Sequence, residues 1–244
     1  VIRVLVSGLP AYRDDWQPII WVLALLSLVI GSFLAVVQTN VKRMLAYSSV
    51  THAGFLLVGV EAAGRTAGEV VPGDGMPSVA LYLMLYSVLV IGMIGVVTVV
   101  SGGSGSNDGD SSLDVFRGLA KRRPALALGF TVLLLAGAGV PLTSGFIAKF
   151  GVIQAAVDIE SYVLAVIAMV AAVVAAFMYL RIMVSMWLND PDDDALAADA
   201  AGTGISIGVS SGLAITAAVA FTVFVGVFPG WLLDAAETVN VIAR

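Results

Sequence analysis

One lysine stands alone in a long uncharged stretch of the chain. Between Pro124 and Val157 the only charged side chain is Lys149, in the sequence Ser-Gly-Phe-Ile-Ala-Lys-Phe. A lysine at the centre of a membrane-embedded helix costs about 2.5–3.5 kcal/mol, so we expect it to face a bundle interior or water. Desolvation disfavours the charged amine, and a buried lysine can therefore exchange a proton near neutral pH. The structural alternative is a lysine that snorkels along its helix or bonds a backbone carbonyl.

A helix-breaking sequence directly precedes this lysine. Residues 136–145 read Ala-Gly-Ala-Gly-Val-Pro-Leu-Thr-Ser-Gly, in which the proline lacks an amide proton and the glycines relax the backbone. A straight helix over residues 124–157 would measure about 51 Å, against a hydrocarbon core of roughly 30 Å. We therefore predict two half-helices joined by an unwound loop near 139–144, and we assign to this loop Gly139, Pro141, Thr143, Ser144 and Gly145. In transporters such an interruption marks an ion or substrate site.

Polar residues also gather in the sequence Ala-Tyr-Ser-Ser-Val-Thr-His-Ala-Gly. His52 and Ser48 are four residues apart, so they share one helix face. For the serines, helix–helix hydrogen bonding is the simpler explanation. His52, whose ordinary pKa lies near 6.5, is a candidate proton relay as much as a packing residue. Tyr47 belongs to the same cluster.

Two further positions are candidates of a weaker kind. Tyr82 and Tyr86 are also four residues apart. Core packing is the ordinary explanation, but the phenol of Tyr86 can hold a water chain in place. Lys42, next to Arg43, is most simply a positive-inside anchor, and a role at the cytoplasmic mouth of a proton path is the alternative.

Composition excludes several classes of protein. The chain is 59% hydrophobic and 12% charged, whereas soluble domains have roughly 45–50% and 25%. It has no cysteine and one histidine, which excludes disulfides, iron–sulfur clusters, thiolate zinc sites and bis-histidine haem on this chain. We therefore predict no metal site. A formal charge of −5 is also unlike the basic footprint of a nucleic-acid-binding protein.

The apolar segments predict an all-α polytopic membrane protein. Residues 1–8 read as the tail of a truncated transmembrane helix, and six segments follow at 18–37, 44–60, 77–101, 124–157, 161–188 and 204–228. The low-complexity stretch 101–114 predicts a flexible loop. Residues 229–244 form a tail whose Trp231 suits the membrane interface.

Basic residues are shared unevenly between the two sides of these segments. One side receives Lys42, Arg43, Arg117, Lys121, Arg122, Arg123 and Arg181, whereas the other receives Arg13, Arg65 and Arg244. By the positive-inside rule the first set faces the cytoplasm, which leaves the C-terminus outside.

Two of these motifs carry a family resemblance. Residues 37–55 (VQTNVKRMLAYSSVTHAGF) and 138–150 (AGVPLTSGFIAKF) are similar to the antiporter-like membrane subunits of respiratory complex I, most of all to the subunit N group of bacterial NADH–quinone oxidoreductases. The resemblance implies a fourteen-helix parent with two inverted five-helix repeats. Residues 18–188 would be the second, C-terminal repeat, with its broken helix at 124–157. Lys149 falls on the ionisable residue of the family's twelfth helix.

The resemblance implies a non-redox proton-translocating subunit. Lys149 would load and release the proton, and His52, Tyr47 and Tyr86 would connect it through water. NADH, FMN, iron–sulfur clusters and quinone would be held by other subunits, and the partners would be sister antiporter-like subunits in a bacterial cytoplasmic (inner) membrane. Sister subunits carry a histidine near the position of Tyr86, so a strict histidine relay does not transfer.

Two alternatives remain open at the level of the sequence. The first is a subunit of a multisubunit monovalent cation/proton antiporter, a class that shares the broken helix. The second is a passive scaffold subunit. The first repeat's glutamate–lysine pair and the central lysine of the eighth helix are not in this sequence, so residues 1–244 alone are expected to lack a complete proton path.

Overall fold

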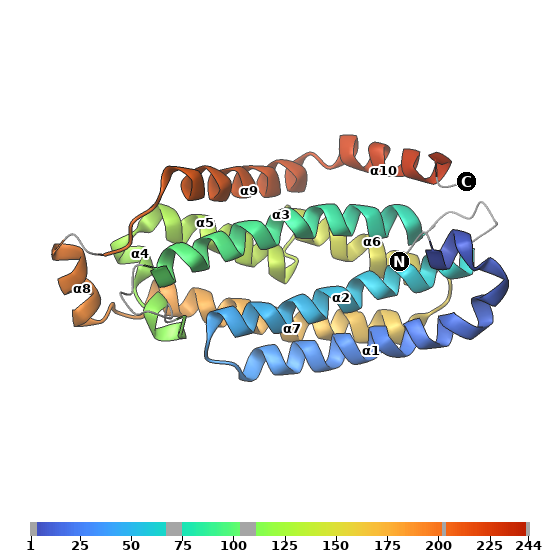
Figure 1. Cartoon of the computed structure of the whole chain (residues 1–244), viewed down its shortest axis with the longest axis horizontal. Coiled ribbons are helices and arrows are strands. Elements are labelled where there is room, and N and C mark those ends of the chain that lie inside the picture. Colours follow the sequence, from blue (N-terminus) through green and yellow to red (C-terminus); the bar gives the residue numbers. More distant parts are fainter. Residues whose placement is uncertain (1–3, 67–74, 103–110, 202–203, 243–244) are drawn as a thin grey trace.

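Long helices running side by side make up the molecule (Figure 1). The computed structural model describes residues 4–66, 75–102, 111–201 and 204–242. The long helices in this part are α1 (Arg13–Val37), α2 (Val41–Thr66), α3 (Gly75–Gly102), α5 (Pro124–Ala138), α6 (Ser144–Asp158), α7 (Tyr162–Leu188) and α9 (Val209–Val227). Each of the six predicted apolar segments overlaps at least one of them.

Four of these helices are long and apolar enough to cross a membrane, namely α1, α3, α7 and α9. The helix α5 is a shorter apolar helix of 15 residues. The helix α2 is as long as its neighbours, but its polar residues and its charges at both ends make it less apolar. The polar residues include the cluster of hydroxyl side chains around His52.

Small residues allow α1 and α2 to pack closely. A Cβ atom at Gly31 would lie 2.7 Å from the backbone nitrogen of Thr51, and one at Gly54 would lie 2.8 Å from that of Leu28. Small residues at membrane-helix interfaces let backbones approach in this way. With this face of α2 occupied by α1, the face that carries His52 is directed toward α3 and α7.

Several short elements close one end of the bundle, at the left of Figure 1. They are η3 (Leu113–Phe116), α4 (Leu119–Arg122) and α8 (Asp193–Ala200). Ion pairs join them: Asp199 pairs with Arg122 and Arg123, Asp192 with Arg117, and Asp190 with Lys121. We call these seven residues the charged end. The acidic run 190–194 thus contributes to a contact between elements, a role that its sequence does not reveal.

The structure corrects some of the predicted boundaries. Residues 103–110 of the predicted flexible loop lie outside the described residues, but Ser111–Asp114 are ordered. Val41 donates a hydrogen bond to the Ser111 carbonyl at 2.7 Å, and Leu113 donates one to the Thr39 carbonyl at 2.8 Å. These two hydrogen bonds give partners to backbone groups at the connection between α1 and α2, which holds residues 111–114 in place.

The C-terminal region also differs from the predicted boundaries. The last long helix begins at Val209 rather than 204, since Gly208 is its extended N-cap and Ile205 is buried in the core ahead of it. The predicted tail contains a helix, α10 (Gly230–Ile242), which packs along α3. The Pro229 carbonyl accepts the first hydrogen bonds of that helix, from Leu232 and Leu233.

Candidate functional site

The helix break lies between α5 and α6. The helix α5 ends at Ala138, and Gly139 follows it in the left-handed conformation with φ +87°. Gly139 donates to the Ala136 carbonyl at 2.9 Å and Val140 donates to the Leu135 carbonyl at 3.1 Å, which is the hydrogen-bond pattern of a Schellman motif. These bonds use the carbonyls of Leu135 and Ala136 and leave those of Gly137 and Ala138 for other donors.

The loop between the two helices turns tightly. Leu142 has a positive φ of 66°, and the Thr143 hydroxyl donates to the Val140 carbonyl at 2.6 Å. Gly145 lies so close to α5 that a Cβ atom there would overlap the Ala136 carbonyl. The hydroxyl oxygen of Ser144 is buried and without a hydrogen-bond partner among the described residues. The helix α9 covers this loop, since Gly226 packs against the backbone of Leu142 and Thr143. Interrupted backbone at membrane depth needs such cover.

Lys149 extends from α6 back to the end of α5. Its side chain is 5% exposed, and its amine donates to the Gly137 carbonyl at 2.8 Å and to the Ala138 carbonyl at 3.1 Å. The amine also lies 5.3 Å from the centre of the Phe55 ring. Carbonyl groups at a helix C-terminus carry partial negative charge, which stabilises a cation there. The structure therefore has the carbonyl contact that the structural alternative describes.

Lys149 has no acidic partner among the described residues. The ion pairs of this part of the chain lie elsewhere, at the charged end and between Glu61 and Arg65. The amine is therefore held by backbone carbonyl groups and by the Phe55 ring, without a carboxylate. That distinction separates Lys149 from an ordinary buried salt bridge.

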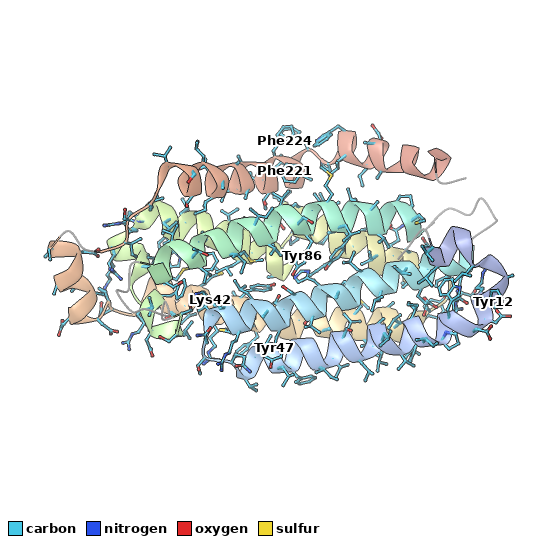
Figure 2. All side chains as sticks on the ribbon, viewed as in Figure 1. Tyr12, Lys42, Tyr47, Tyr86, Phe221 and Phe224 are labelled. Atoms are coloured by element: carbon cyan, nitrogen blue, oxygen red, sulfur yellow. The ribbon has the colours of Figure 1, made fainter. Side chains whose placement is uncertain are left out.

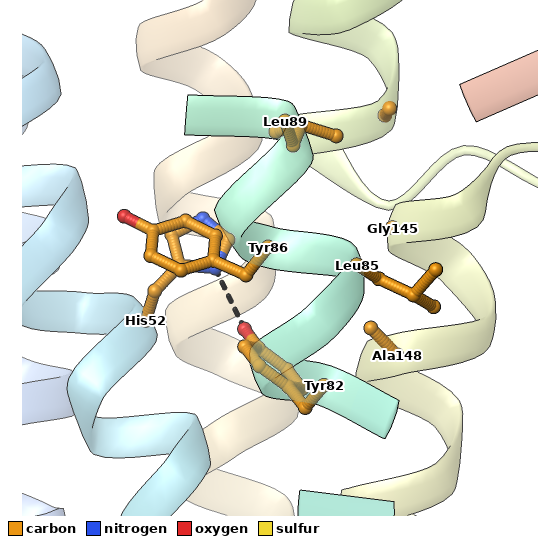
Figure 3. Close-up of a pocket in the computed structure, with 8 residues that line it drawn as sticks. His52, Tyr82, Leu85, Tyr86, Leu89, Gly145 and Ala148 are labelled. Atoms are coloured by element: carbon orange, nitrogen blue, oxygen red, sulfur yellow. Dashed lines mark hydrogen bonds between the residues drawn. The ribbon is translucent and has the colours of Figure 1, made fainter. Parts of the chain in front are cut away.

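His52 is held by hydroxyl groups on both sides of its ring. Its Nδ1 atom is 2.7 Å from the Tyr82 hydroxyl, as Figure 3 shows, and its Nε2 atom is 3.2 Å from the Tyr179 hydroxyl. The Tyr179 hydroxyl also bonds Ser48. These four residues form a hydrogen-bonded chain from α3 through α2 to α7. In a neutral imidazole one nitrogen donates and the other accepts, so the chain can pass a proton by changing tautomer.

Tyr86 contacts this chain through its ring. It is stacked on His52 with ring centres 4.2 Å apart and an angle of 19° between the planes (Figure 3). Its hydroxyl donates to Ser49 at 2.8 Å. Tyr86 therefore lies beside the imidazole, and its hydroxyl is bonded away from the ring nitrogens.

A small cavity connects the histidine with the helix break. It measures about 10 Å³ and is lined by His52, Tyr82, Leu85, Tyr86, Leu89, Ala136, Gly145 and Ala148. This is close to the volume of one water molecule, but the accessible surface of the cavity is apolar. Figure 3 shows Gly145 and Ala148 of α6 on the opposite side of α3 from His52.

Tyr179 provides a second connection between the two groups. A Cβ atom on Gly137 would lie 2.8 Å from Cζ of the Tyr179 ring, so this ring packs directly on the backbone of Gly137. The carbonyl of the same glycine accepts the hydrogen bond from Lys149. The histidine chain and the lysine thus meet at one residue.

The structure brings together only some of the predicted residues. Lys149, His52, Tyr86 and the loop residues lie around the break. Tyr47 is half-buried and packs against the apolar core, and in the described part of the chain it is not a member of the histidine chain. Lys42 is exposed near the beginning of α2, toward α4 (Figure 2).

Sequence reasoning missed the part played by two tyrosines. The sequence pattern favours core packing for Tyr82, and it does not single out Tyr179. The signal for Tyr179 is its polarity within the apolar segment 161–188. The packing of α7 against α2 decides that the Tyr179 hydroxyl meets Ser48 and His52.

Comparison with known proteins places the chain in a family. The family model described as NADH:quinone oxidoreductase/Mrp antiporter, transmembrane, matches residues 1–175. The chain belongs to this family. It is therefore an antiporter-like membrane protein with several apolar helices.

Relatives in this family include NADH-quinone oxidoreductase subunit N of Rhodococcus opacus (strain B4). The two are 38% identical over 244 residues, which is 100% of this chain and 42% of the relative. The chain thus spans about two-fifths of the length of that relative.

Solved structures share the fold of this antiporter-like chain. A chain of the Mrp complex from Dietzia sp. DQ12-45-1b aligns with a TM-score of 0.74 and 20% identity, over 97% of this chain and 50% of that one. A chain of respiratory complex I from Thermus thermophilus with bound NADH aligns with a TM-score of 0.71 and 22% identity, over 95% and 46%.

Proposed function

We propose that this antiporter-like chain is a non-redox proton-translocating part of an NADH–quinone oxidoreductase. The observation that carries the proposal is the buried amine of Lys149, held by two carbonyl groups at a helix break. The similarity to subunit N relatives supports the assignment to this enzyme.

In the proposed mechanism Lys149 is the proton-loading group. The carbonyls of Gly137 and Ala138 hold the protonated amine, and His52 with Tyr82 and Tyr179 passes protons to and from it. Water that enters between His52 and Lys149 completes the connection. A positive charge that appears nearby favours release and a negative one favours uptake, since every 1.36 kcal/mol changes the proton affinity tenfold.

The proposal includes the architecture and setting of the chain. The chain supplies six membrane-spanning segments and the tail of a seventh, as the second of two inverted repeats. It lies in a bacterial cytoplasmic membrane with the charged end facing the cytoplasm and the C-terminus outside. Its partners are other membrane-arm subunits, including sister antiporter-like subunits. NADH, FMN, iron–sulfur clusters and quinone are bound by other chains.

The test is Lys149→Ala in the full-length protein and its assembled complex. We expect the complex to assemble and proton pumping per quinone reduced to fall, because the only buried amine on this part of the path is gone. The matched control is Lys121→Ala, since Lys121 lies at the charged end and is exposed. Wild-type pumping by Lys149→Ala would overturn the proposal and support the passive scaffold.

A second candidate is a subunit of a monovalent cation/proton antiporter. The observation that favours it is the structural similarity to the Mrp complex. Sodium- or potassium-dependent proton flux without an NADH-oxidising assembly would support this candidate. Co-purification with NADH-oxidising subunits would support the first.

A further inference from the structure

A buried carboxyl group lies at the end of the bundle opposite the charged end. Glu61 is near the C-terminal end of α2, and it is 1% exposed. Its Oε1 atom accepts from Arg65 Nε at 2.9 Å, and its Oε2 atom has no hydrogen-bond partner among the described residues. Glutamate is almost never fully buried without satisfied partners. The free oxygen of Glu61 therefore requires an explanation.

A cavity is lined in part by Glu61. It lies between α1 and α2, measures about 420 Å³, and is lined by Asp14, Gln17, Trp21, Val22, Glu61 and Arg65, among others. The amide nitrogen of Gln17 is also buried and lacks a hydrogen-bond partner in the described part of the chain. The cavity is large enough for on the order of ten water molecules.

The chemistry of the lining favours a proton over a metal ion. No group of three or more histidine, aspartate or glutamate side chains that could hold a metal occurs among the described residues. The charge of Arg65 opposes a second cation beside Glu61. A proton requires one free carboxylate oxygen, which Oε2 supplies, and water to exchange with, for which the cavity that Glu61 lines has room.

We propose that Glu61 is the proton-exchange group where the path opens to water at this end of the bundle. The inference rests on the proposed function, which it extends by a residue and a site. Water in the cavity transfers a proton to Oε2, which becomes a hydroxyl group. The reverse transfer restores the carboxylate and leaves the proton on water.

The groups that face Glu61 come from three elements. Arg65 lies one turn further along α2, and Asp14 and Gln17 reach the cavity from α1. The hydroxyl of Ser161, between α6 and α7, faces the same carboxyl group. Arg65 holds one oxygen in place, and the other remains available for the proton.

An apolar layer separates Glu61 from His52. The two residues are nine positions apart on α2, about 13 Å along the helix and on opposite faces. Buried Val58 on α2 and Val152 on α6 lie in the intervening turns, and Val152 packs against Gly59. This layer keeps water in the cavity from reaching the lysine at rest. A dry apolar constriction of this kind closes a path to ions.

The first test is Glu61→Gln in the full-length protein within its assembled, vesicle-reconstituted complex. We expect proton pumping to fall by about tenfold or more, because a positioned proton-transfer group contributes on the order of 10² or more. The dependence of pumping on pH at that membrane face should also be lost, and Glu61→Asp should restore part of both. Glu160→Gln is the matched control, because Glu160 is exposed.

Wild-type pumping and pH dependence in Glu61→Gln would overturn the inference. If Lys149→Ala in the same assay still abolished pumping, only this inference would fail and the proposed function would stand. If pumping depends on sodium and this dependence disappears in Glu61→Gln, the ion exchanged at Glu61 is sodium and not a proton. That result would also overturn the inference.

The second test does not require removal of the carboxyl group. The chain has no cysteine of its own, so Gln17→Cys introduces a single thiol into the cavity wall. A membrane-impermeant thiol reagent should label it from one side of the vesicle, whereas Ile20→Cys, one turn away and buried, should remain unlabelled. Failure to label Gln17→Cys from either side would show that water does not reach Glu61 and would overturn the inference.

Discussion

Positive charges are held in two different ways in this molecule. At the charged end, Arg122 is nearly buried, 7% exposed, and its Nε donates to an Asp199 carboxylate oxygen at 2.6 Å. At the helix break, Lys149 is equally buried, but its amine meets carbonyl groups only. The first arrangement matches a charge with an opposite charge, and the second matches it with dipoles.

The two arrangements differ in how firmly each fixes the protonation state of the charged group. An arginine paired with a carboxylate stays charged at any physiological pH. The hydrogen bond from Arg122, with the nearby charges of Arg122 and Arg123, lowers the pKa of Asp199, so both partners are fixed in their ionised forms. The amine of Lys149 has no such anchor, and under the proposed function a small change in the local field decides its protonation. The ion pairs of the charged end stabilise the fold, whereas the amine at the helix break is the group to which the proposed function assigns proton transfer.

The largest expected effect tests this difference directly. Lys149→Arg keeps a positive charge and its hydrogen bonds, but an arginine does not release a proton. We expect pumping in the assembled complex to fall by about 100-fold, the scale of a lost proton-transfer group. Measuring proton uptake and quinone reduction together in vesicles tests this expected fall. Lys121→Arg at the charged end should pump normally, and pumping by Lys149→Arg at the wild-type rate would remove the distinction.

Two glycines with positive φ allow a matched comparison. Gly139 ends α5 with φ +87°, and Gly118 precedes α4 with φ +61°. Alanine at either position should lower stability by about 1–2 kcal/mol, because the left-handed conformation is strained for a residue with a Cβ atom. Gly118→Ala should cost more, because its Cβ would also lie 2.5 Å from the backbone nitrogen of Pro191. Only Gly139→Ala should also reduce pumping per assembled complex, since its Cβ would lie 3.0 Å from Lys149 Cδ. Thermal unfolding and pumping assays would separate the two, and an equal loss of pumping would contradict the comparison.

A smaller effect is expected from the histidine chain. Tyr82→Phe removes the hydroxyl that lies 2.7 Å from His52 Nδ1 while it keeps the ring. A hydrogen bond contributes about 1 kcal/mol, so we expect pumping to fall by roughly fivefold. Tyr162→Phe is the control, because Tyr162 is exposed at the beginning of α7. Unchanged pumping in Tyr82→Phe would mean that His52 does not need this partner.

The smallest effect concerns the charged end and depends on pH. Because the folded pKa of Asp199 lies below its usual value of 3.8, its pairing stabilises the fold above that pH. The contribution is lost as the pH falls through the lowered value. Asp199→Asn should therefore destabilise the protein by about 1 kcal/mol or less at neutral pH, and the difference should vanish in acid. Thermal unfolding at several pH values measures it, and a loss of pumping would contradict the structural role.

The amino-acid sequence alone was sufficient to find the helix break and its lysine. Both are local properties: a proline among glycines stops a helix wherever it lies, and a single charge in 34 apolar or uncharged positions stands out without any fold. The apolar segments were predicted for the same reason, since the length and composition of each are written in one continuous stretch.

Only the tertiary structure decided which groups meet. Ser48 and Tyr179 are 131 positions apart, and Arg122 and Asp199 are 77 apart, so no local pattern links them. The packing of α2 against α3 and α7 brings Tyr82 and Tyr179 to His52 but leaves Tyr47 against the apolar core. The backbone carbonyls that hold Lys149 carry no signature in the sequence, because every residue has one. Their availability depends on where a helix ends and what packs against that end, which is a property of the folded chain.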